Sequence, residues 1–185
     1  MEWHATGSLT ARPALGHSEL LAAPVVRALT SLDPDVAERV GVAAIDPALA
    51  DTAEFCARYR VSLDDSANCV VIRGKRGGDV MYAACMVLAT SRADVNGVVR
   101  RRLGARTASF APMDEAVALT GMEYGGITAL GLPADWPILV DAAVARAAEV
   151  VIGSGIRGSK LFLPGSVLAP LPTAEVIEDL ARPIE

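Results

Sequence analysis

Two glycine-rich segments in the second half of the chain constrain its fold more than any other feature. The first, residues 120–131, reads Thr-Gly-Met-Glu-Tyr-Gly-Gly-Ile-Thr-Ala-Leu-Gly, and the second, residues 153–158, reads Gly-Ser-Gly-Ile-Arg-Gly. Glycine adopts positive φ angles without penalty and lets another backbone or a ligand approach closely. With a short apolar stretch between them, the two segments predict a cleft lined by backbone N–H groups. The plain alternative is that both are ordinary turns.

The composition favours a cytoplasmic protein with one hydrophobic core. The chain has 185 residues, of which 52% are apolar and only 4% aromatic. That length suits one domain, here 1–185, with a core built mainly from Ala, Val and Leu. The longest strongly apolar stretch, 80–89, is about half as long as a membrane helix, and residues 1–4 lack the basic start of a signal peptide. Neither a membrane partner nor export is therefore expected.

Cysteine content and net charge argue against a disulfide-rich or metal-binding protein and against a protein that coats nucleic acid. The three cysteines, Cys56, Cys69 and Cys85, are an odd number without C-x-x-C spacing, which predicts neither a disulfide framework nor a metal site. A net charge of −5 argues against a protein that coats nucleic acid. A local basic patch stays open, because seven of the seventeen basic residues lie in two short stretches, 73–76 and 100–106. Solvated surface charges are the alternative.

The pattern of apolar residues predicts an α+β fold with a mixed sheet. Apolar runs at 68–73 and 80–89, separated by a glycine-rich basic turn, predict a hairpin. Further strands are expected at 42–45, 108–110, 138–140, 149–152 and 161–163. Helical periods predict helices at 13–32, 51–59, 95–103 (after a capping box that starts at Ser91) and 113–119, with a last helix at 173–181 capped by Thr173. A helical extension, 1–40, is thus expected at the start of the chain.

Familiar catalytic motifs do not fit the chain. Residues 153–158 match G-x-G-x-x-G but lead into an expected strand instead of the helix that a dinucleotide site requires, and Ser159-Lys160 reverses the Lys-Ser/Thr order of a P-loop. No Ser-His-Asp order emerges, and Cys69 is expected to be a small buried hydrophobe. What survives is a site of backbone amides that could stabilise the oxyanion of an attacked ester, with no cofactor.

Six stretches in one collinear order resemble the YbaK/ProX family of free-standing aminoacyl-tRNA deacylases, which are similar to the editing domain of bacterial prolyl-tRNA synthetase. They are 66–71 (Ser-Ala-Asn-Cys-Val-Val), 101–105 (Arg-Arg-Leu-Gly-Ala), 116–121 (Ala-Val-Ala-Leu-Thr-Gly), 125–131, 138–141 (Ile-Leu-Val-Asp) and 153–158. The resemblance covers a core, 45–182, and implies a mixed, barrel-like β-sheet flanked by helices. It also implies hydrolysis of the ester at the 3′ end of a mischarged tRNA, without metal or cofactor, with a synthetase as a possible partner.

The resemblance also implies which residues form the site. Asn68, Gly126, Gly153 and Gly155 would take part in catalysis, the amides of both segments holding the carbonyl oxygen. The substrate-binding positions would be Gly125, Ile127, Thr128, Ala129, Asp141, Ser154 and Arg157, with Asp141 in the polar wall.

At two positions the chain departs from the family pattern. Asn68 stands where deacylases usually carry a lysine, and Ala129 where a proline usually closes the loop. An amide replaces a full positive charge, and charge-assisted hydrogen bonds are roughly twice as strong as neutral ones. Arg73, Lys75 or Arg157 could supply the charge instead. Two other interpretations stay open: a non-catalytic relative that binds an aminoacyl or nucleotide-like ligand or a partner through the same cleft, and a small-ester hydrolase unrelated to tRNA.

Overall fold

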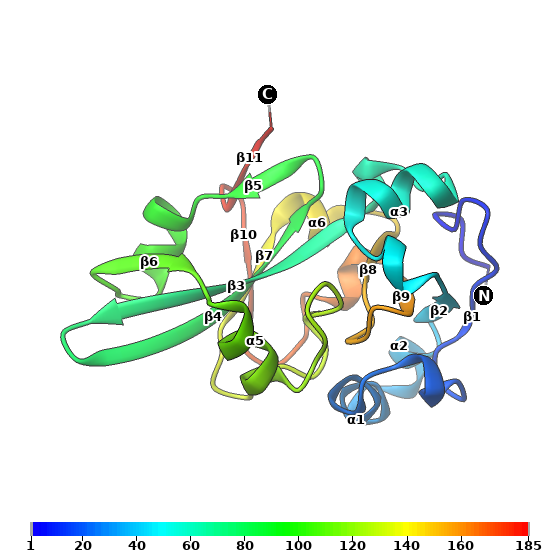
Figure 1. Ribbon diagram of the computed structural model, residues 1–185, viewed down its shortest axis with the longest axis horizontal. Coiled ribbons are helices and arrows are strands. Elements are labelled where there is room, and N and C mark those ends of the chain that lie inside the picture. The colour runs from blue at the N-terminus through cyan, green and yellow to red at the C-terminus, as the bar shows by residue number, and fades with distance from the viewer. Residues whose placement is uncertain (1, 185) are drawn as a thin grey trace.

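The computed structural model describes residues 2–184, and most of its strands belong to two mixed or antiparallel sheets (Figure 1). One sheet has the order β1-β2-β9-β8, a second has the order β10-β7-β4-β3-β6, and β11 pairs with β5. The strands are β1 (Arg12–Pro13), β2 (Gly41–Ala44), β3 (Ala67–Arg76), β4 (Asp79–Leu88), β5 (Ser91–Ala93), β6 (Thr107–Phe110), β7 (Ile138–Asp141), β8 (Val150–Gly153), β9 (Ser159–Leu163), β10 (Ala174–Ile177) and β11 (Ala181–Pro183).

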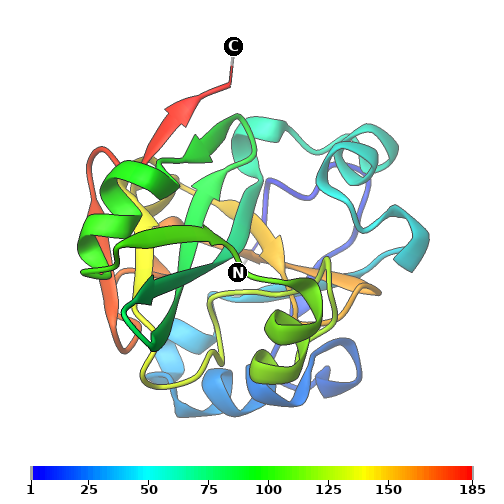
Figure 2. The ribbon, with the colours of Figure 1, turned by 60° about the vertical axis from the view of Figure 1, so that its left-hand side comes forward.

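Short helices flank these strands. They are α1 (Ala23–Ser31), α2 (Pro34–Ala37), α3 (Thr52–Tyr59), α4 (Arg100–Arg102, after a π-helical turn at Val95–Val99), α5 (Met113–Thr120) and α6 (Ala142–Arg146). The α+β fold expected from the sequence is therefore confirmed. The strands curve around a shared interior (Figure 2), but the hydrogen-bonded order of the described strands forms separate sheets and does not close into a barrel.

Among the described residues, one isolated β-bridge links the two large sheets, and it lies next to the site. Ser66, just before β3, forms an isolated parallel bridge with Val151 of β8. Further along, β3 leaves β8 and pairs with β6 instead, from Ile72 to Lys75. A gap opens between β3 and β8 where they separate, and the N-terminus of α3 and the first glycine segment border this gap.

The hairpin is the element that the sequence predicted best. β3 and β4 pair in register over ten residues, from Ala67 opposite Leu88 to Arg76 opposite Asp79, around the turn at Gly77 and Gly78. Its buried residues, among them Ile72 and Cys85, join the apolar cluster with Leu139 of β7. The hairpin is longer than predicted because its basic outer end still pairs.

Three predicted helices were wrong in part or in full. The last helix, 173–181, is absent: these residues form β10, which adds to the edge of β7 in parallel, and the start of β11. Pairing with an open sheet edge outweighed the helical period. The helix predicted at 13–32 is confined to Ala23–Ser31 with a 3-10 turn before it. Ser91 lies in β5, and Asp94 instead caps the helical turn that follows, accepting a hydrogen bond from the Gly97 amide.

Apolar side chains from both sheets and from α1 form the main core. Val25 and Leu29 of α1 are buried against Leu161 and Ile152 of the first sheet. Helix α1 thereby packs on the back of the second glycine segment, where a Cβ on Gly155 would lie 2.4 Å from Cβ of Ala22. Among residues 2–184, no helix has the length and apolar character needed to cross a membrane.

Candidate functional site

The two glycine segments meet, as the sequence predicted. The Gly155 amide donates a hydrogen bond to the Gly126 carbonyl oxygen (2.7 Å), and the Glu123 amide donates one to the Gly155 carbonyl oxygen (2.8 Å). The backbones are so close that a Cβ on Gly126 would lie 2.5 Å from the Ile156 carbonyl oxygen, and a Cβ on Gly153 would lie 2.4 Å from that of Gly126. Glycine is required at both positions because no side chain fits.

A cavity of about 330 Å³ opens beside this contact, in the gap between β3 and β8. Its wall combines β3, the start of α3, the junction of β6 with α5, the first glycine segment and the facing ends of β8 and β9. The lining residues are Ala50, Asp51, Thr52, Ala67, Asn68, Cys69, Val70, Val71, Phe110, Ala111, Ala116, Tyr124, Gly125, Ile127, Gly153 and Lys160. The volume lies at the low end of the usual range for small-molecule sites, roughly 300–1,000 Å³.

Three lining residues occupy one row across neighbouring strands. Gly153 lies directly opposite Lys160 in the antiparallel pair β8–β9. Asn68 and Gly153 each lie two residues beyond the parallel bridge between Ser66 and Val151, on the two sides of the gap where β3 and β8 separate, and both line the cavity. The row therefore runs from Asn68 through Gly153 to Lys160. Since the central residue has no side chain, nothing in the row itself separates the outer two.

Lys160 brings a positive charge to the cavity wall. Its side chain is only 7% exposed, and its Nζ donates a hydrogen bond to the Ala50 carbonyl oxygen (2.8 Å) and lies 5.2 Å from the ring centroid of Phe55. Burial lowers the pKa of this amine to about 8, a shift that the nearby Arg157 reinforces and Cys56 and Asp51 oppose. At neutral pH the amine is thus mostly an ammonium, and it is desolvated.

Asn68, one of the catalytic positions expected from the resemblance, is a neutral wall residue. Its Oδ1 accepts a hydrogen bond from Thr52 Oγ1 (2.6 Å) at the first turn of α3. Of the three cations considered as substitutes, none lines the cavity. Arg73 pairs with Glu115 (3.2 Å), and Lys75 lies near the outer end of the hairpin. Arg157 donates to the carbonyl oxygens of Pro47 and Tyr124 and lies 3.5 Å from the Asp51 carboxylate.

Only some of the amides in the two segments are free to hold a ligand. Those of Gly126 and Gly155 donate to carbonyl oxygens of Glu123 and Gly126, so they maintain the loops rather than point into the cavity. Within residues 2–184, the amide of Ile127 has no hydrogen-bond partner, and Ile127 lines the cavity. Gly125, which also lines the wall, has a φ of 82°. The candidate amides thus lie at Gly125 and Ile127.

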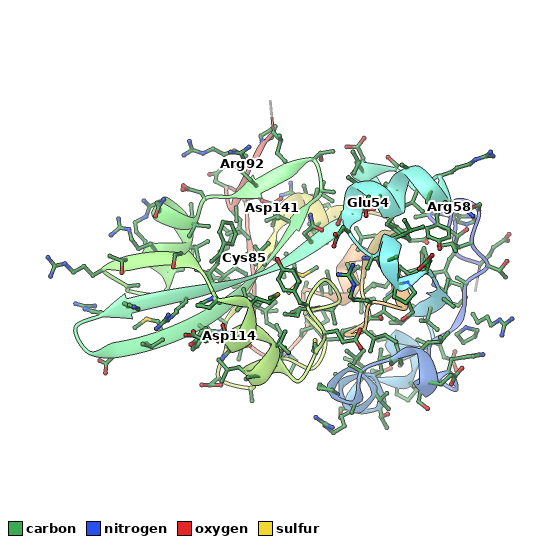
Figure 3. All side chains as sticks on the ribbon, in the orientation of Figure 1. Glu54, Arg58, Cys85, Arg92, Asp114 and Asp141 are labelled. Atoms are coloured by element: carbon green, nitrogen blue, oxygen red, sulfur yellow. The ribbon has the colours of Figure 1, made fainter. Side chains whose placement is uncertain are left out.

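The remaining predicted residues do not line the cavity. Ser154 is fully buried and donates to the carbonyl oxygens of Ile156 and Ser159, which fixes the second segment. Thr128 and Ala129 are buried, and Ala129 borders a separate, more apolar cavity next to α1. Asp141, labelled in Figure 3, caps α6 by accepting from the Ala143 amide (2.9 Å) and also accepts from the Ala181 amide (3.0 Å). Asp141 does not line this cavity.

The cavity has no activated nucleophile of its own. Cys69 lines the wall, but burial raises the pKa of its thiol to about 12, so it carries no thiolate at neutral pH. Within the described residues, no group of three or more His, Cys, Asp and Glu side chains is arranged to hold a metal ion. The chemistry available in the wall is that of backbone amides, Asn68 and the Lys160 ammonium.

Aromatic side chains border the cavity on its open side. Phe110 at the end of β6 is 65% exposed and Tyr124 in the first glycine segment is 57% exposed. In a chain with only eight aromatic residues, two exposed rings beside one cavity form a contact surface for a planar group. Lys160, by contrast, is buried. The cavity therefore has an aromatic rim and a charged interior.

Sequence reasoning missed Lys160 as a site residue and treated it only as a failed P-loop position. A signal was nevertheless present. Lys160 is one of two lysines in the chain and directly precedes the apolar triplet Leu-Phe-Leu of β9. A lysine in such an apolar strand indicates a functional role, because burial of an ammonium is energetically costly.

Comparison with known proteins places the chain among editing domains. The model of the aminoacyl-tRNA editing domain family matches residues 46–170, so the chain belongs to this family, and the resemblance deduced from the sequence is confirmed. A structure described as a proposed trans-editing enzyme for prolyl-tRNA synthetase is 19% identical, with a TM-score of 0.68 over 85% of this chain and 97% of that one.

Two further solved structures share the fold. A scaffold protein used for computational epitope grafting is 20% identical with a TM-score of 0.68, covering 85% of this chain and 97% of that chain. A hypothetical protein is 22% identical with a TM-score of 0.63, covering 72% and 85% respectively. At these identities the likeness concerns the fold alone. No curated protein matches the chain significantly.

Proposed function

We propose that this protein is a trans-acting deacylase that hydrolyses the ester of a mischarged tRNA in the cytoplasm. The observation that carries the proposal is the cavity between β3 and β8, where both glycine segments of an editing-family chain border a space of acyl size. Its interior offers polar groups for an ester, and its rim offers rings for the terminal base.

The reaction needs only water as co-reactant. The water oxygen forms a bond to the ester carbonyl carbon and releases one proton to the surrounding water, and the negative charge moves to the carbonyl oxygen. The intermediate then breaks the bond to the ribose oxygen, which takes up a proton, and leaves a free amino acid and a tRNA with an intact ribose hydroxyl. The amide of Ile127 is the donor proposed for the oxyanion, since fixed donors of this kind lower the barrier most.

The aromatic rim favours the 3′ end of a tRNA as the substrate, rather than a generic small ester. Phe110 and Tyr124 would stack on the terminal adenine while the ester enters the cavity, and stacking contributes about 1–3 kcal/mol per base. A small ester without a planar group would leave both rings in water. In this arrangement the nucleoside would remain at the rim, beside the two exposed rings.

The proposal is tested by incubating the protein with a panel of mischarged tRNAs, beginning with alanyl- and cysteinyl-tRNA for proline, and following ester loss. Thr52→Trp would fill the cavity from the first turn of α3 and is expected to abolish hydrolysis. Ala57→Trp on the exposed side of the same helix is the matched control and should retain it. Ester loss that survives Thr52→Trp would reject this cavity as the site.

The non-catalytic alternative has one observation in its favour. Asn68 replaces the family's usual lysine and is already engaged by Thr52. This alternative predicts that no mischarged tRNA is hydrolysed, whereas an uncleavable aminoacyl-adenosine amide still binds. If Thr52→Trp abolishes that binding, the cavity is a binding site without catalysis.

A further inference from the structure

The cavity wall contains a buried positive charge, that of Lys160. Lys160 and Lys75 are the only lysines of the chain, and Lys75 lies near the outer end of the hairpin, exposed to solvent. Lys160 is buried, yet among the described residues no carboxylate forms an ion pair with it. A buried ammonium without an anionic partner is unfavourable, and such groups are common at functional sites.

The contacts of Lys160 leave part of its charge available to a ligand. An ammonium has three N–H donors, and only the one directed to the Ala50 carbonyl oxygen has a partner among the described residues. The Phe55 ring supports the cation from one side. Because Lys160 lines the cavity, the two remaining donors have a ligand-sized space to serve.

We propose that Lys160 is the cationic catalytic residue of this deacylase, replacing from β9 the lysine that its relatives carry at the position of Asn68. The two residues lie in one row, on either side of Gly153, and both line the cavity. The absence of a side chain at Gly153 lets a cation enter the same space from two strands away. This inference rests on the proposed function and identifies the residue that supplies the positive charge for the reaction.

The ammonium acts on the oxyanion of the reaction intermediate. Phe110 and Tyr124 mark the exposed rim, whereas Lys160 lies in the buried interior, where the acyl end of the substrate must sit. It donates a hydrogen bond to the carbonyl oxygen as negative charge develops there, and it keeps its own proton throughout. A tRNA phosphate, attached on the far side of the ribose, would remain nearer to the rim.

The first test replaces the ammonium with an apolar side chain of similar length. Lys160→Met is expected to lower kcat about 100-fold or more with little change in KM, since loss of one oxyanion donor typically costs 10²–10³ in kcat. Arg58→Met, which removes an exposed cation from α3 (Figure 3), is the control and should leave both constants unchanged. Circular dichroism and thermal melting establish that both variants are folded.

The second test moves the charge and distinguishes catalysis from a structural role. In Lys160→Met, the further change Asn68→Lys returns a lysine to the family's usual position and is expected to recover at least tenfold in kcat. Asn68→Lys alone would place two cations in one row and should not raise activity. A merely structural lysine would not be replaceable from another strand.

The third test follows pH. Around the ammonium lie Asp51 and Cys56 from the α3 region, Cys69 from β3 and Arg157 from the second segment. Activity that depends on the ammonium falls as pH rises through the pKa of Lys160, which is about 8. Lys160→Met should lose this alkaline limb. Protein labelled with ¹⁵N-lysine gives two ammonium signals, and the one missing in Lys160→Met reports this titration without any activity measurement.

The outcomes separate the two proposals. Wild-type hydrolysis with Lys160→Met equally active, or with an unchanged alkaline limb, overturns the role of Lys160 and leaves the deacylase standing. A rise in KM at constant kcat also overturns it, because the ammonium would then bind the ground state. A wild-type protein that hydrolyses no mischarged tRNA overturns the deacylase and, with it, the role assigned here.

Discussion

At the scale of single residues, Lys160 illustrates a conflict between stability and function. Lowering the pKa of an amine from 10.5 to about 8 corresponds to about 3 kcal/mol against the charged form in the folded state. The contact with Ala50 and the ring of Phe55 offset only part of the lost hydration. A chain selected for stability alone would place an apolar residue at this position in β9.

This conflict predicts a pH-dependent stability difference between the wild type and Lys160→Met. Because the pKa of Lys160 is lower in the folded state, the unfolded state binds more protons between about pH 8 and 10.5. Wild-type stability should therefore rise relative to Lys160→Met across that window, by at most about 1.4 kcal/mol per pH unit. Below it, where both states are protonated, the difference should be constant.

Urea unfolding of both proteins at several pH values measures this difference directly. Other groups that titrate at high pH affect both proteins equally, so they cancel in the comparison. Parallel stability curves for the two proteins would mean that the Lys160 amine is well solvated after folding.

Residue identities predicted where the site lies better than they predicted what each site residue does. The glycine pattern located the contact between the two segments, because only glycine permits such a close approach of two backbones. It did not reveal that the Gly126 and Gly155 amides are already engaged, since hydrogen-bond partners depend on loop conformation. Nor did it locate Lys160, whose importance depends on pairing between strands.

At the scale of elements, the second glycine segment is held between α1 and the first segment. A Cβ on Gly153 would collide with the carbonyl oxygens of Gly126 and Ile127, and a Cβ on Gly155 would collide with Ala22 and Val25. The main chain of these loops is fixed before any ligand binds. Such preorganisation suits a site whose donors are backbone amides.

Gly153→Ala tests how tightly the segments interlock. Its Cβ would lie 2.4 Å from one backbone oxygen and 2.8 Å from another, neither of which is a flexible side-chain end. We expect a loss of at least about 1–3 kcal/mol in the free energy of unfolding, as for other overpacked sites. Gly78→Ala in the hairpin turn, where a Cβ meets nothing within 4 Å, should change it by less than about 0.5 kcal/mol. Equal effects would show that the loops separate easily.

Helices and strands that depend on nearby residues were predictable from the sequence. Strands that form only by pairing with a segment far away in the sequence were not. The hairpin follows from two apolar runs around a glycine turn, and α5 ends where Gly121 adopts a φ of 67°. By contrast, β10 exists because β7 offers an open edge to residues more than thirty positions away. A helical period of nine residues could not anticipate that edge.

At the scale of the whole molecule, the charge is unevenly distributed. The net charge is −5, yet both basic stretches lie together at the hairpin end, where the Arg106 amide donates to the Lys75 carbonyl oxygen and Arg76 donates to that of Gly104. Strand β3 connects this end to the cavity. The seven steps along β3 from Asn68 to Lys75 span about 23 Å at about 3.3 Å per residue. A tRNA whose 3′ end enters the cavity can therefore bring acceptor-stem phosphates to these cations.

Neutralising three exposed cations of this end should weaken binding of tRNA but not chemistry. In the triple variant Lys75→Ser, Arg101→Ser, Arg106→Ser, we expect a higher KM for mischarged tRNA between about 50 and 200 mM salt and a shallower salt dependence. The slope should fall by about 1 for each phosphate that the variant no longer neutralises. Hydrolysis of a minimal aminoacyl-adenosine ester should be unchanged, because it does not reach beyond the rim. Arg58→Ser, at the opposite end of the molecule (Figure 3), should leave the salt slope intact. If the triple variant and the wild type share one slope, the acceptor stem does not lie along β3.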